Sequence, residues 1–324
     1  MKHEYRVTGD AAGQRLDKFL RKRLSEVPVS HLYKLVRTKK VRVNGTRAAI
    51  AQLLNEGDVV IVHAAQARPD APLPERPAAH VRQDFRILYE DAHLLVCDKP
   101  AGLPIHPGTG ITGDTLVDQA RAYLARQGLE VAEGEFKPSP AHRLDRETSG
   151  VVVVAKTRQA MVRLTEIFTA GEAKKTYLAL AKGRFQKERG TIEVRLPEHQ
   201  QTFASKQVRG VNLQEAVTHY SKVAGGNETT LLELGIETGR THQIRRHLAA
   251  IGHPVVGDAK YGDFAFNRRA RASLGLRRMF LHSSRLALEH PITRKRLAFS
   301  APLPDELSEA LERAGIAWKP TSTV

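Results

Sequence analysis

Residues 141–155 read AHRLDRETSGVVVVA, and no other stretch of the chain says more about its fold and chemistry. Four consecutive valines at 151–154 are typical of a strand buried on both faces. Asp145 lies in the polar loop before that strand, between Arg143 and Arg146. Such a carboxylate is either a salt-bridged turn residue or, inside a pocket, a base or nucleophile that its guanidinium neighbours keep ionised. The pattern alone leaves both interpretations open.

Short apolar runs separated by Gly and Pro continue on both sides of this strand. They predict strands at 86–89, 94–97, 151–155, 177–181, 229–234 and 296–300. One helix is predicted over 158–170, where apolar residues recur at helical spacing and Gly171 ends the pattern. Because strands outnumber helices and do not alternate with them, we expect an α+β fold with a mixed, mainly antiparallel sheet and flanking helices.

The charge of the chain predicts its kind of partner. Its 324 residues include 51 Lys and Arg against 35 Asp and Glu, which gives a net charge of +16. Such an excess favours nucleic acid or an anionic membrane surface. No apolar run approaches the roughly 20 residues that a membrane span needs, and the amino terminus lacks an apolar signal segment. We therefore expect a cytoplasmic, monomeric protein that faces RNA or DNA and has no membrane partner.

Several common catalytic patterns are absent from the sequence. There is no GxxxxGK[ST] nucleotide-binding loop, no HExxH zinc helix and no GxSxG nucleophile elbow. The one cysteine, Cys97, excludes an intramolecular disulfide and a zinc site built from cysteines. The sequence thus predicts chemistry without a metal, a nucleotide or any other cofactor.

The amino-terminal segment has a character of its own. Residues 1–60 hold 13 Lys or Arg and 6 Asp or Glu, a local excess of +7. Two amphipathic helices, a Val-Asn-Gly turn and a Gly-Asp turn before a strand follow one another over residues 14–62. This order resembles the S4 RNA-binding domain, a small α/β unit in which the second helix and the hairpin present basic groups to phosphates. The resemblance implies RNA contacts from Arg15, Lys18, Lys34, Arg37, Lys39 and Lys40. An ordinary solvated helix face is the alternative.

We expect the chain to be organised in three parts. Residues 1–64 form the S4-like domain, and residues 84–324 form a larger catalytic domain. Between them, residues 65–83 are rich in alanine and contain four prolines. Prolines at this density favour an extended, semi-rigid linker.

Four collinear segments of the larger part resemble the RluA family of RNA pseudouridine synthases. They are DKPAGLPIHP (98–107), HRLDRETSGVVVVAKT (142–157), KKTY (174–177) and TGRTHQIR (238–245). With the S4-like part in front, the whole chain is similar to the C group of that family, which acts on large-subunit ribosomal RNA. The resemblance implies a cofactor-independent isomerisation of specific uridines to pseudouridine. Its expected partner is large-subunit (23S) ribosomal RNA or an assembly intermediate that contains it.

The resemblance also implies roles for individual residues. Asp145 would be the catalytic carboxylate, which attacks the sugar or the base or removes a proton from C2′; the sequence leaves these routes open. Arg245 would pair with Asp145, and Tyr177 would offer a ring face to the uracil and a hydroxyl for proton transfer. Ile244 would close the other face of the ring. A surface helix charge, a half-buried strand tyrosine and a core isoleucine are the respective structural alternatives.

The remaining predicted contacts concern the flipped nucleotide and the RNA backbone. Arg143 would fill the space that the target nucleotide leaves when it flips out of folded RNA. Lys99 and His106 are expected to bind the substrate by shaping its pocket, and His142 to hold its own loop. Phosphate contacts are predicted from an arginine-rich segment, through Arg268, Arg269 and Arg271.

Two other functions remain open from the sequence. The chain could be a noncatalytic S4-type ribosome-assembly factor that keeps the fold, in which case it would bind RNA and form no pseudouridine. Alternatively, the same chemistry could act on transfer RNA. Formation of pseudouridine separates the first alternative from an enzyme, and the identity of the modified RNA separates the second.

Overall fold

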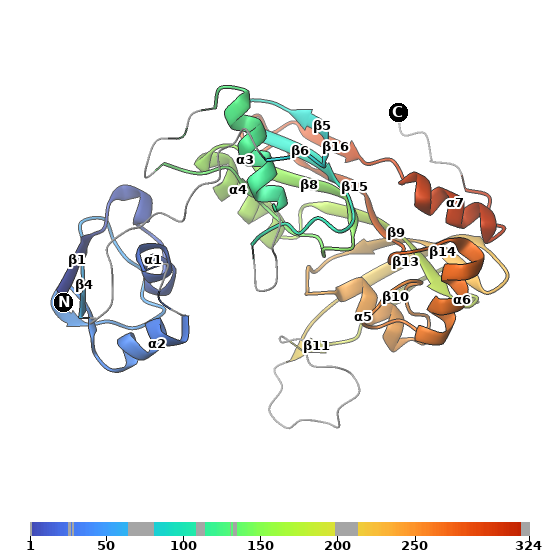
Figure 1. The fold of residues 1–324 in the computed structure, drawn as a ribbon, viewed down its shortest axis with the longest axis horizontal. Coiled ribbons are helices and arrows are strands. Elements are labelled where there is room, and N and C mark those ends of the chain that lie inside the picture. Colours follow the sequence, from blue (N-terminus) through green and yellow to red (C-terminus); the bar gives the residue numbers. More distant parts are fainter. Residues whose placement is uncertain are drawn as a thin grey trace. The chain divides into compact units, whose positions relative to one another are not determined.

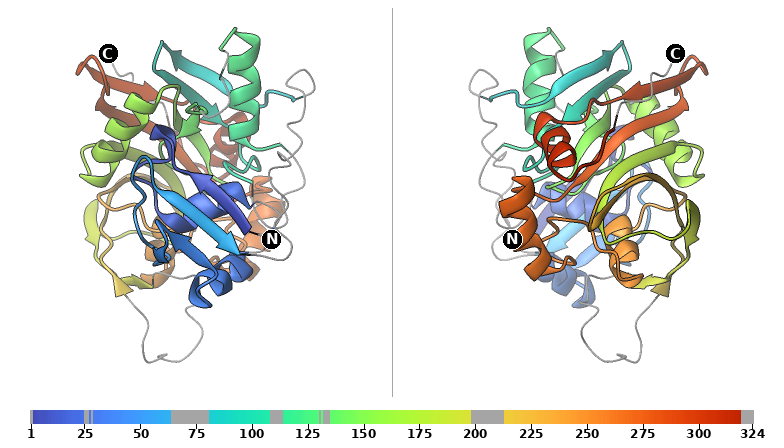
Figure 2. Two further views of the ribbon diagram at one scale, coloured as in Figure 1. Left: turned by 90° about the vertical axis from the view of Figure 1, so that its left-hand side faces the viewer. Right: turned by 90° about the vertical axis from the view of Figure 1, so that its right-hand side faces the viewer.

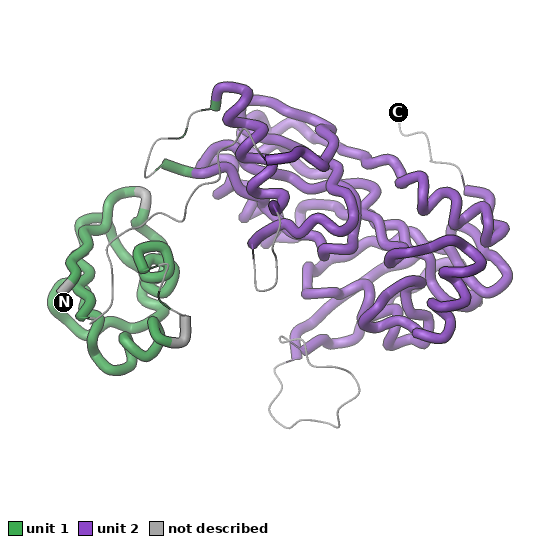
Figure 3. The backbone as a smooth tube through the Cα atoms, in the orientation of Figure 1, with its two compact units in different colours: residues 1–80, 129–136 green, residues 81–128, 137–324 purple. Residues whose placement is uncertain are grey.

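The computed structural model describes residues 2–24, 27, 29–63, 81–107, 114–129, 131, 135–197 and 213–318. The chain forms two compact units (Figure 3). Unit 1 comprises residues 1–80 and 129–136, and unit 2 comprises residues 81–128 and 137–324. Most of the expected linker at 65–83 lies outside the described residues, which resume at residue 81 within unit 2.

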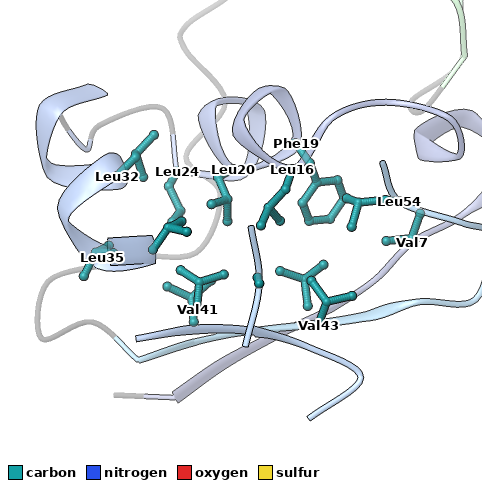
Figure 4. Packing of buried hydrophobic residues seen from close by; sticks show 14 of the residues in the cluster. Val7, Leu16, Phe19, Leu20, Leu24, Leu32, Leu35, Val41, Val43 and Leu54 are labelled. Carbon is teal, nitrogen blue, oxygen red and sulfur yellow. The ribbon is translucent and has the colours of Figure 1, made fainter. Parts of the chain in front are cut away.

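Unit 1 is a small four-stranded antiparallel sheet with two α-helices (Figure 1). Its elements are β1 (Lys2–Arg6), a 3-10 turn (Gly9–Ala11), α1 (Leu16–Arg23), α2 (Val29–Arg37), β2 (Val41–Val43), β3 (Thr46–Arg47) and β4 (Val59–His63). The strand order is β1-β4-β2-β3. The apolar faces of both helices pack on the sheet, and Figure 4 shows this core with Leu16, Phe19, Leu20, Leu32, Leu35, Val41 and Val43. Burial of these side chains removes their apolar surface from water and stabilises the unit.

The hairpin between β2 and β3 depends on two residues with positive φ. Asn44 has φ of 50° and Gly45 has φ of 75°, as a two-residue type I′ turn requires. The Asn44 side chain accepts a hydrogen bond from the backbone N–H of Val59 at 2.8 Å and donates one to Asp58 at 2.8 Å. The turn predicted from Val-Asn-Gly is therefore confirmed, and its side chain also ties it to β4.

Unit 2 contains a ten-stranded mixed sheet with five α-helices among its described residues (Figure 1). Its elements are β5 (Arg86–Glu90), β6 (Leu94–Lys99), α3 (Leu116–Arg126), β7 (Ser139–Pro140), β8 (Ser149–Ala155), α4 (Arg158–Thr169), β9 (Lys174–Lys182), β10 (Arg189–Ile192), β11 (Leu196–Pro197), β12 (Leu213–Gln214), β13 (Thr218–Gly225), β14 (Thr229–Ile236), α5 (Gln243–Ala250), α6 (Phe264–Leu274), β15 (Leu281–Glu289), β16 (Arg296–Ser300) and α7 (Asp305–Arg313). The strand order is β10-β13-β14-β9-β15-β8-β6-β5, with β16 paired to β15 and β7 paired to β8. Strands β11 and β12 form a separate two-stranded sheet.

The pairing of β15 with β8 is parallel, whereas the other strand pairs of the described sheet are antiparallel. The predicted α+β class and the mainly antiparallel sheet are therefore confirmed. Each strand predicted from the sequence lies inside an observed strand, and the segment 296–300 matches its strand at both ends. The predicted helix at 158–170 is α4.

Strand β8 is buried along its whole length, as its run of valines predicts. Both views in Figure 2 place α3 and α4 on opposite sides of this part of the sheet. Two covering helices explain why both faces of the strand are apolar. Helices α6 and α7 share a second core with Leu180 of β9, Leu231 and Phe280. The centre of the sheet is thus held rigidly from both faces, and the loop that carries Asp145 emerges there.

Candidate active site

Where the loop before β8 enters the strand, its main chain is in close contact with the main chain of β15. Ser149 and Gly150 pair in parallel with His282 and Ser283. Gly150 has φ of +117°, and a Cβ atom there would lie 2.1 Å from the backbone oxygen of Ser283. Only glycine fits this approach of two main chains. The glycine of the 141–155 stretch therefore fixes where the preceding loop leaves the sheet.

Asp145 forms an ion pair with Arg245 from α5. Arg245 Nη1 donates to Asp145 Oδ2 at 2.9 Å, and the same guanidinium donates from Nε and Nη2 to both oxygens of Asp258 at 2.7 and 2.9 Å. The side chain of Asp145 is 19% exposed, and that of Asp258 is 0% exposed. The expected Arg245–Asp145 pair is present. A carboxylate that the sequence did not single out, Asp258, holds the guanidinium in place.

Electrostatics at this pair follow from burial and shared hydrogen bonds. Burial opposes ionisation of Asp258, but Arg245 and the backbone N–H groups of Lys260 and Tyr261 hold its pKa below the usual range. Burial disfavours the charged form of Arg245 too, yet Asp258 and Asp145 raise its pKa further above the ordinary value. One guanidinium thus serves two carboxylates, and the planar fork of arginine suits that geometry.

Tyr177 lies on β9 within electrostatic range of Asp145. Its side chain is buried and forms a hydrogen bond with Ser283 of β15. Burial raises the pKa of Tyr177, and the charge of Asp145 raises it further, so the phenol keeps its proton at neutral pH. Ile244 is buried in the first turn of α5, next to Arg245. Strand β9 and helix α5 therefore bring Tyr177 and Arg245 to one carboxylate.

Lys99 lies between two loops of the site. It is fully buried, and its ammonium donates to the backbone oxygens of Pro100, Leu103 and Arg146 at 2.8, 2.9 and 3.1 Å. Burial lowers its pKa to about 7. These bonds join the loop after β6 to the loop of Asp145. The role of Lys99 in shaping the substrate pocket stays a prediction.

The other predicted side chains lie in the Asp145 loop and in the loop after β6. Arg143 is exposed, and so is His106, whose pKa is lowered by partial burial and by the charges of Arg143 and Arg121. His142 accepts a hydrogen bond from the backbone N–H of Val153 at 3.1 Å, and burial lowers its pKa to about 3. It therefore holds the loop against β8, as predicted.

Three polar residues near Asp145 were missed from the sequence, namely His242, Asp258 and Tyr261. His242 Nε2 lies 3.7 Å from Asp145 Oδ1, and its Nδ1 lies 3.0 Å from the hydroxyl of Tyr261. His242 belongs to the TGRTHQIR segment, which gave a signal for it. Asp258 and Tyr261 follow a Val-Gly turn with no distinctive spacing, so nothing in the sequence marks them.

The predicted RNA-binding residues of unit 1 lie on its surface. Lys18, Lys34, Arg37, Lys39 and Lys40 are exposed, and Arg15 is exposed while paired with Asp17. A groove of about 370 Å³ is lined by Lys34 and Arg37 of α2 and by residues outside the prediction, Tyr33, Val36, Arg47, Ala48, Ala49 and Ile50. Tyr33 is 45% exposed, which leaves an aromatic side chain among the cations.

In unit 2, Arg268, Arg269 and Arg271 are exposed on α6. Arg278, from the same arginine-rich segment, has its side chain turned inward, where it pairs with Glu306 at 2.6 Å and donates to Ser149 Oγ at 3.1 Å. The segment therefore splits into a solvent-facing part and a structural part.

Within the described part of the chain, no helix combines the length and the apolar character that crossing a bilayer needs. The described residues also do not gather three or more His, Cys, Asp or Glu side chains in the manner of a metal site.

Comparison with known proteins bears directly on this arrangement. Residues 93–250, which contain Asp145, Tyr177 and Arg245, match the model of the RNA pseudouridylate synthase family, and residues 14–60 match the S4 domain model. A protein of Escherichia coli K12 named ribosomal large subunit pseudouridine synthase C is 35% identical over 313 residues, which cover 95% of each chain. The chain belongs to the RNA pseudouridylate synthase family. It is accordingly an enzyme of the pseudouridine synthase type with an amino-terminal S4 domain.

Two further relatives extend the comparison of this pseudouridine synthase. A Haemophilus ducreyi protein with the same name is 34% identical over 313 residues, which cover 95% of this chain and 94% of that one. The solved structure of human RNA pseudouridylate synthase domain containing 4 is 28% identical, with a TM-score of 0.58 over 72% of this chain and 94% of that one. The resemblance read from the four sequence segments is confirmed.

Proposed function

We propose that this pseudouridine synthase converts specific uridines of large-subunit ribosomal RNA to pseudouridine, with Asp145 as the reacting carboxylate. The observation that carries the proposal is the ion pair with Arg245. It holds Asp145 Oδ2 at 2.9 Å in a partly buried site, next to a buried tyrosine. Among the described residues, no hydrogen bond reaches the other oxygen, Oδ1, which leaves it available to a substrate. The ribosomal target is supported by the names of the relatives that span 95% of this chain.

The reaction needs little from the protein in chemical terms. The N1–C1′ bond of uridine breaks, a C5–C1′ bond forms, C5 loses its proton and N1 gains one, so no oxidant or transferred group is required. Asp145 would either attack the sugar or the base, or take the C2′ proton, and each route begins from an anionic carboxylate. Arg245 donates a charge-assisted hydrogen bond to that carboxylate and holds it in place. Tyr177 keeps its proton and therefore acts in our proposal as a hydrogen-bond donor or a proton carrier.

The target base must leave its stack to reach a partly buried carboxylate. Flipping a nucleotide costs a few kcal/mol, which contacts with the flipped base and the vacated space must offset. Arg143 is exposed two residues before Asp145, so it is placed in our proposal to fill the vacated space. Ile244 is buried beside Arg245 and would limit the room on one side of the ring. His106, exposed near Arg143, would contact the nucleotide at the entrance.

Affinity for the RNA would come from the exposed cations. Those of the S4 domain and Arg268, Arg269 and Arg271 would bind phosphates, which provides affinity without reading sequence. We propose that residues 1–64 recognise RNA, that residues 65–83 link them to the catalytic part at 84–324, and that the protein acts as a cytoplasmic monomer. Sedimentation of the enzyme at micromolar concentration would detect a dimer, which would contradict the monomer.

The test is release of tritium from RNA that carries 5-tritiated uridine. Asp145→Asn is expected to abolish release while RNA affinity stays unchanged, because the amide cannot act as an anion. Asp305→Asn is the control: it removes the same charge from an exposed position in the first turn of α7. Turnover by Asp145→Asn at the wild-type rate would contradict the catalytic role. Conversion of transfer RNA but not of large-subunit ribosomal RNA would contradict the proposed substrate and leave the chemistry intact.

A further inference from the structure

His242 adopts a left-handed backbone conformation that is uncommon outside glycine. It precedes the first residue of α5 with φ of 54° and ψ of 30°, in the left-handed region. Outside glycine this region is sparsely populated, and asparagine enters it more readily than most residues. Strained backbone of this kind persists where surrounding contacts hold it, often at functional sites. The contacts of the imidazole show which groups this backbone conformation brings together.

The imidazole of His242 lies between Asp145 and Tyr261. Its Nε2 is 3.7 Å from Asp145 Oδ1, and its Nδ1 is 3.0 Å from the Tyr261 hydroxyl. The two rings meet edge to face, 5.5 Å apart. The Arg245 guanidinium lies 5.1 Å from the centre of the Tyr261 ring. Tyr261 thus contacts both groups that face the oxygens of Asp145.

The charges around His242 favour a proton on Nε2. Burial, Arg245 and Lys260 lower its pKa, whereas Asp145 and Asp258 oppose that shift, and the net direction leaves the imidazole neutral at pH 7. A neutral imidazole has one N–H group. An N–H on Nε2 attracts the Asp145 carboxylate, and a lone pair there would repel it. With the proton on Nε2, Nδ1 is an acceptor, and the hydroxyl of Tyr261 donates to it.

We propose that His242 is a positioning residue for the reacting carboxylate, and that Tyr261 fixes its tautomer. Arg245 holds Oδ2 of Asp145, while the N–H at Nε2 of His242 aims at Oδ1 and sets the rotation of the carboxylate plane. The separation of 3.7 Å is too long for a hydrogen bond in the free enzyme. Such catalytic hydrogen bonds often tighten only when the substrate is bound. The inference rests on the proposed function, since it assigns a partner to the catalytic oxygen.

Two amide variants of His242 separate positioning from mere folding. In His242→Gln the side-chain NH₂ can occupy the place of Nε2 and still reach Asp145, but the bond with Tyr261 is lost. In His242→Asn the shorter amide can occupy the place of Nδ1 and keep Tyr261, but it cannot reach Asp145. Asparagine also suits the left-handed backbone better than glutamine does. A purely structural role therefore predicts that the Asn variant is the more active, and our proposal predicts the reverse order.

The measurement is the single-turnover rate constant on large-subunit ribosomal RNA, together with the dissociation constant for that RNA. We expect His242→Asn to react at least about tenfold more slowly than His242→Gln, the size of effect given by one hydrogen bond to a charged group. The RNA dissociation constant should be the same in both variants. Equal rates, or a faster Asn variant, would overturn the proposal.

A pH profile gives an independent readout through Tyr261→Phe. Loss of the donated O–H destabilises the neutral imidazole, so the acid limb of the rate should move to higher pH by up to about one unit. In His242→Gln that limb should lose the contribution of the histidine. Tyr123→Phe is the matched control, because it removes a hydroxyl bonded to Glu90 at 2.8 Å, away from the described site. A Tyr261→Phe profile that superimposes on the wild type would contradict the role of Tyr261.

The same experiments distinguish failure of this inference from failure of the proposed function. If the wild type forms no pseudouridine in ribosomal RNA, or Asp145→Asn stays active, the function itself fails. If the wild type is active and Asp145→Asn is inactive, but the order of the two His242 variants is reversed, only the positioning role fails.

Discussion

The basic residues of this protein occupy two contrasting environments. In unit 1, Lys18, Arg37 and their neighbours are exposed on two short helices and face water. In unit 2, the side chain of Arg245 is 11% exposed, and its guanidinium is shared between Asp145 and Asp258. The same residue type is therefore exposed to solvent in one place and holds a carboxylate in the other.

The two environments differ in whether one cation serves several protein groups at once. In our proposal each exposed cation of unit 1 meets a phosphate through high-dielectric solvent, so it would contribute a small and separate share of affinity. Around Asp145, Arg245 serves two carboxylates and Lys99 serves three backbone oxygens. Removal of one member leaves the others buried without a partner, which is far more costly than loss of an exposed charge.

Substitution of arginine by lysine should show the largest difference in effect between the two environments. Arg245→Lys keeps the charge but cannot donate to Asp258 and Asp145 at once, because an ammonium lacks the planar fork. We expect its single-turnover rate to fall by about 10²- to 10³-fold, with RNA affinity unchanged. Arg37→Lys is the control and should leave both values unchanged, since a phosphate accepts either cation. Equal rates in the two variants would remove the contrast between the environments.

Two glycines with positive φ, one in each unit, allow a similar comparison of how tightly the units are packed. A Cβ at Gly150 would lie 2.1 Å from the backbone of Ser283, whereas a Cβ at Gly45 would meet nothing within 4 Å. Gly150→Ala should lower the free energy of unfolding of unit 2 by more than about 3 kcal/mol, because two main chains must separate. Gly45→Ala should lower that of unit 1 by only about 1 kcal/mol, the strain of the left-handed backbone.

Amide hydrogen exchange measured separately in the two units would give both free energies. Similar losses in the two variants would show that the close approach of β8 and β15 relaxes easily. The Asp145 loop would then not be fixed by that joint.

The fold was predictable where the local pattern and the tertiary environment agree. The valines of β8 predicted burial on both faces, and the Asn44-Gly45 pair predicted a tight hairpin, because both signals are local. The parallel pairing of β8 with β15 joins residues 149–150 to residues 282–283. Nothing in either segment alone specifies that partner, so this joint could not be predicted without the structure.

The candidate site shows the same division. Asp145 and Arg245 stood out in distinctive segments, and their ion pair was anticipated. Asp258 carries no such signal, because its importance comes from burial beside α5 after the chain has folded. Lys99 shows the same limit: the sequence marked it as important but could not show that its ammonium donates to three backbone oxygens.

Burial in unit 2 should also appear in the pH dependence of its stability. The pKa of His142 is about 3 in the folded protein, and an unfolded histidine titrates near 6.5. Between these values the unfolded state binds a proton that the folded state does not, so stability falls as the pH falls. One such proton gives a slope of about 1.4 kcal/mol per pH unit. His282, whose pKa burial lowers to about 4, adds a second proton of the same sign.

His142→Gln can still accept the hydrogen bond from Val153 but does not titrate. We expect the free energy of unfolding of unit 2, measured between pH 4.5 and 6, to depend less steeply on pH in this variant, by about 1.4 kcal/mol per unit. Identical slopes in the variant and the wild type would mean that His142 becomes protonated in the folded protein.

The smallest single effects are expected from the exposed cations, and they test the comparison through additivity. Lys18→Gln and Arg37→Gln lie on different helices and share no partner among the described residues. Each should weaken RNA binding a few-fold and lower the slope of log affinity against log salt by about 0.7 to 0.9. In the double variant the losses of binding free energy should add to within about 0.5 kcal/mol.

Arg245→Lys combined with Asp258→Asn should instead depart from additivity of the activation free energies by about 1 kcal/mol or more. Arg245→Lys already disturbs the ion pair with Asp258, so the second substitution has less left to remove. Additive behaviour in both pairs would mean that Arg245 acts on Asp145 without help from Asp258, whereas coupling in both would mean that Lys18 and Arg37 bind the same phosphate.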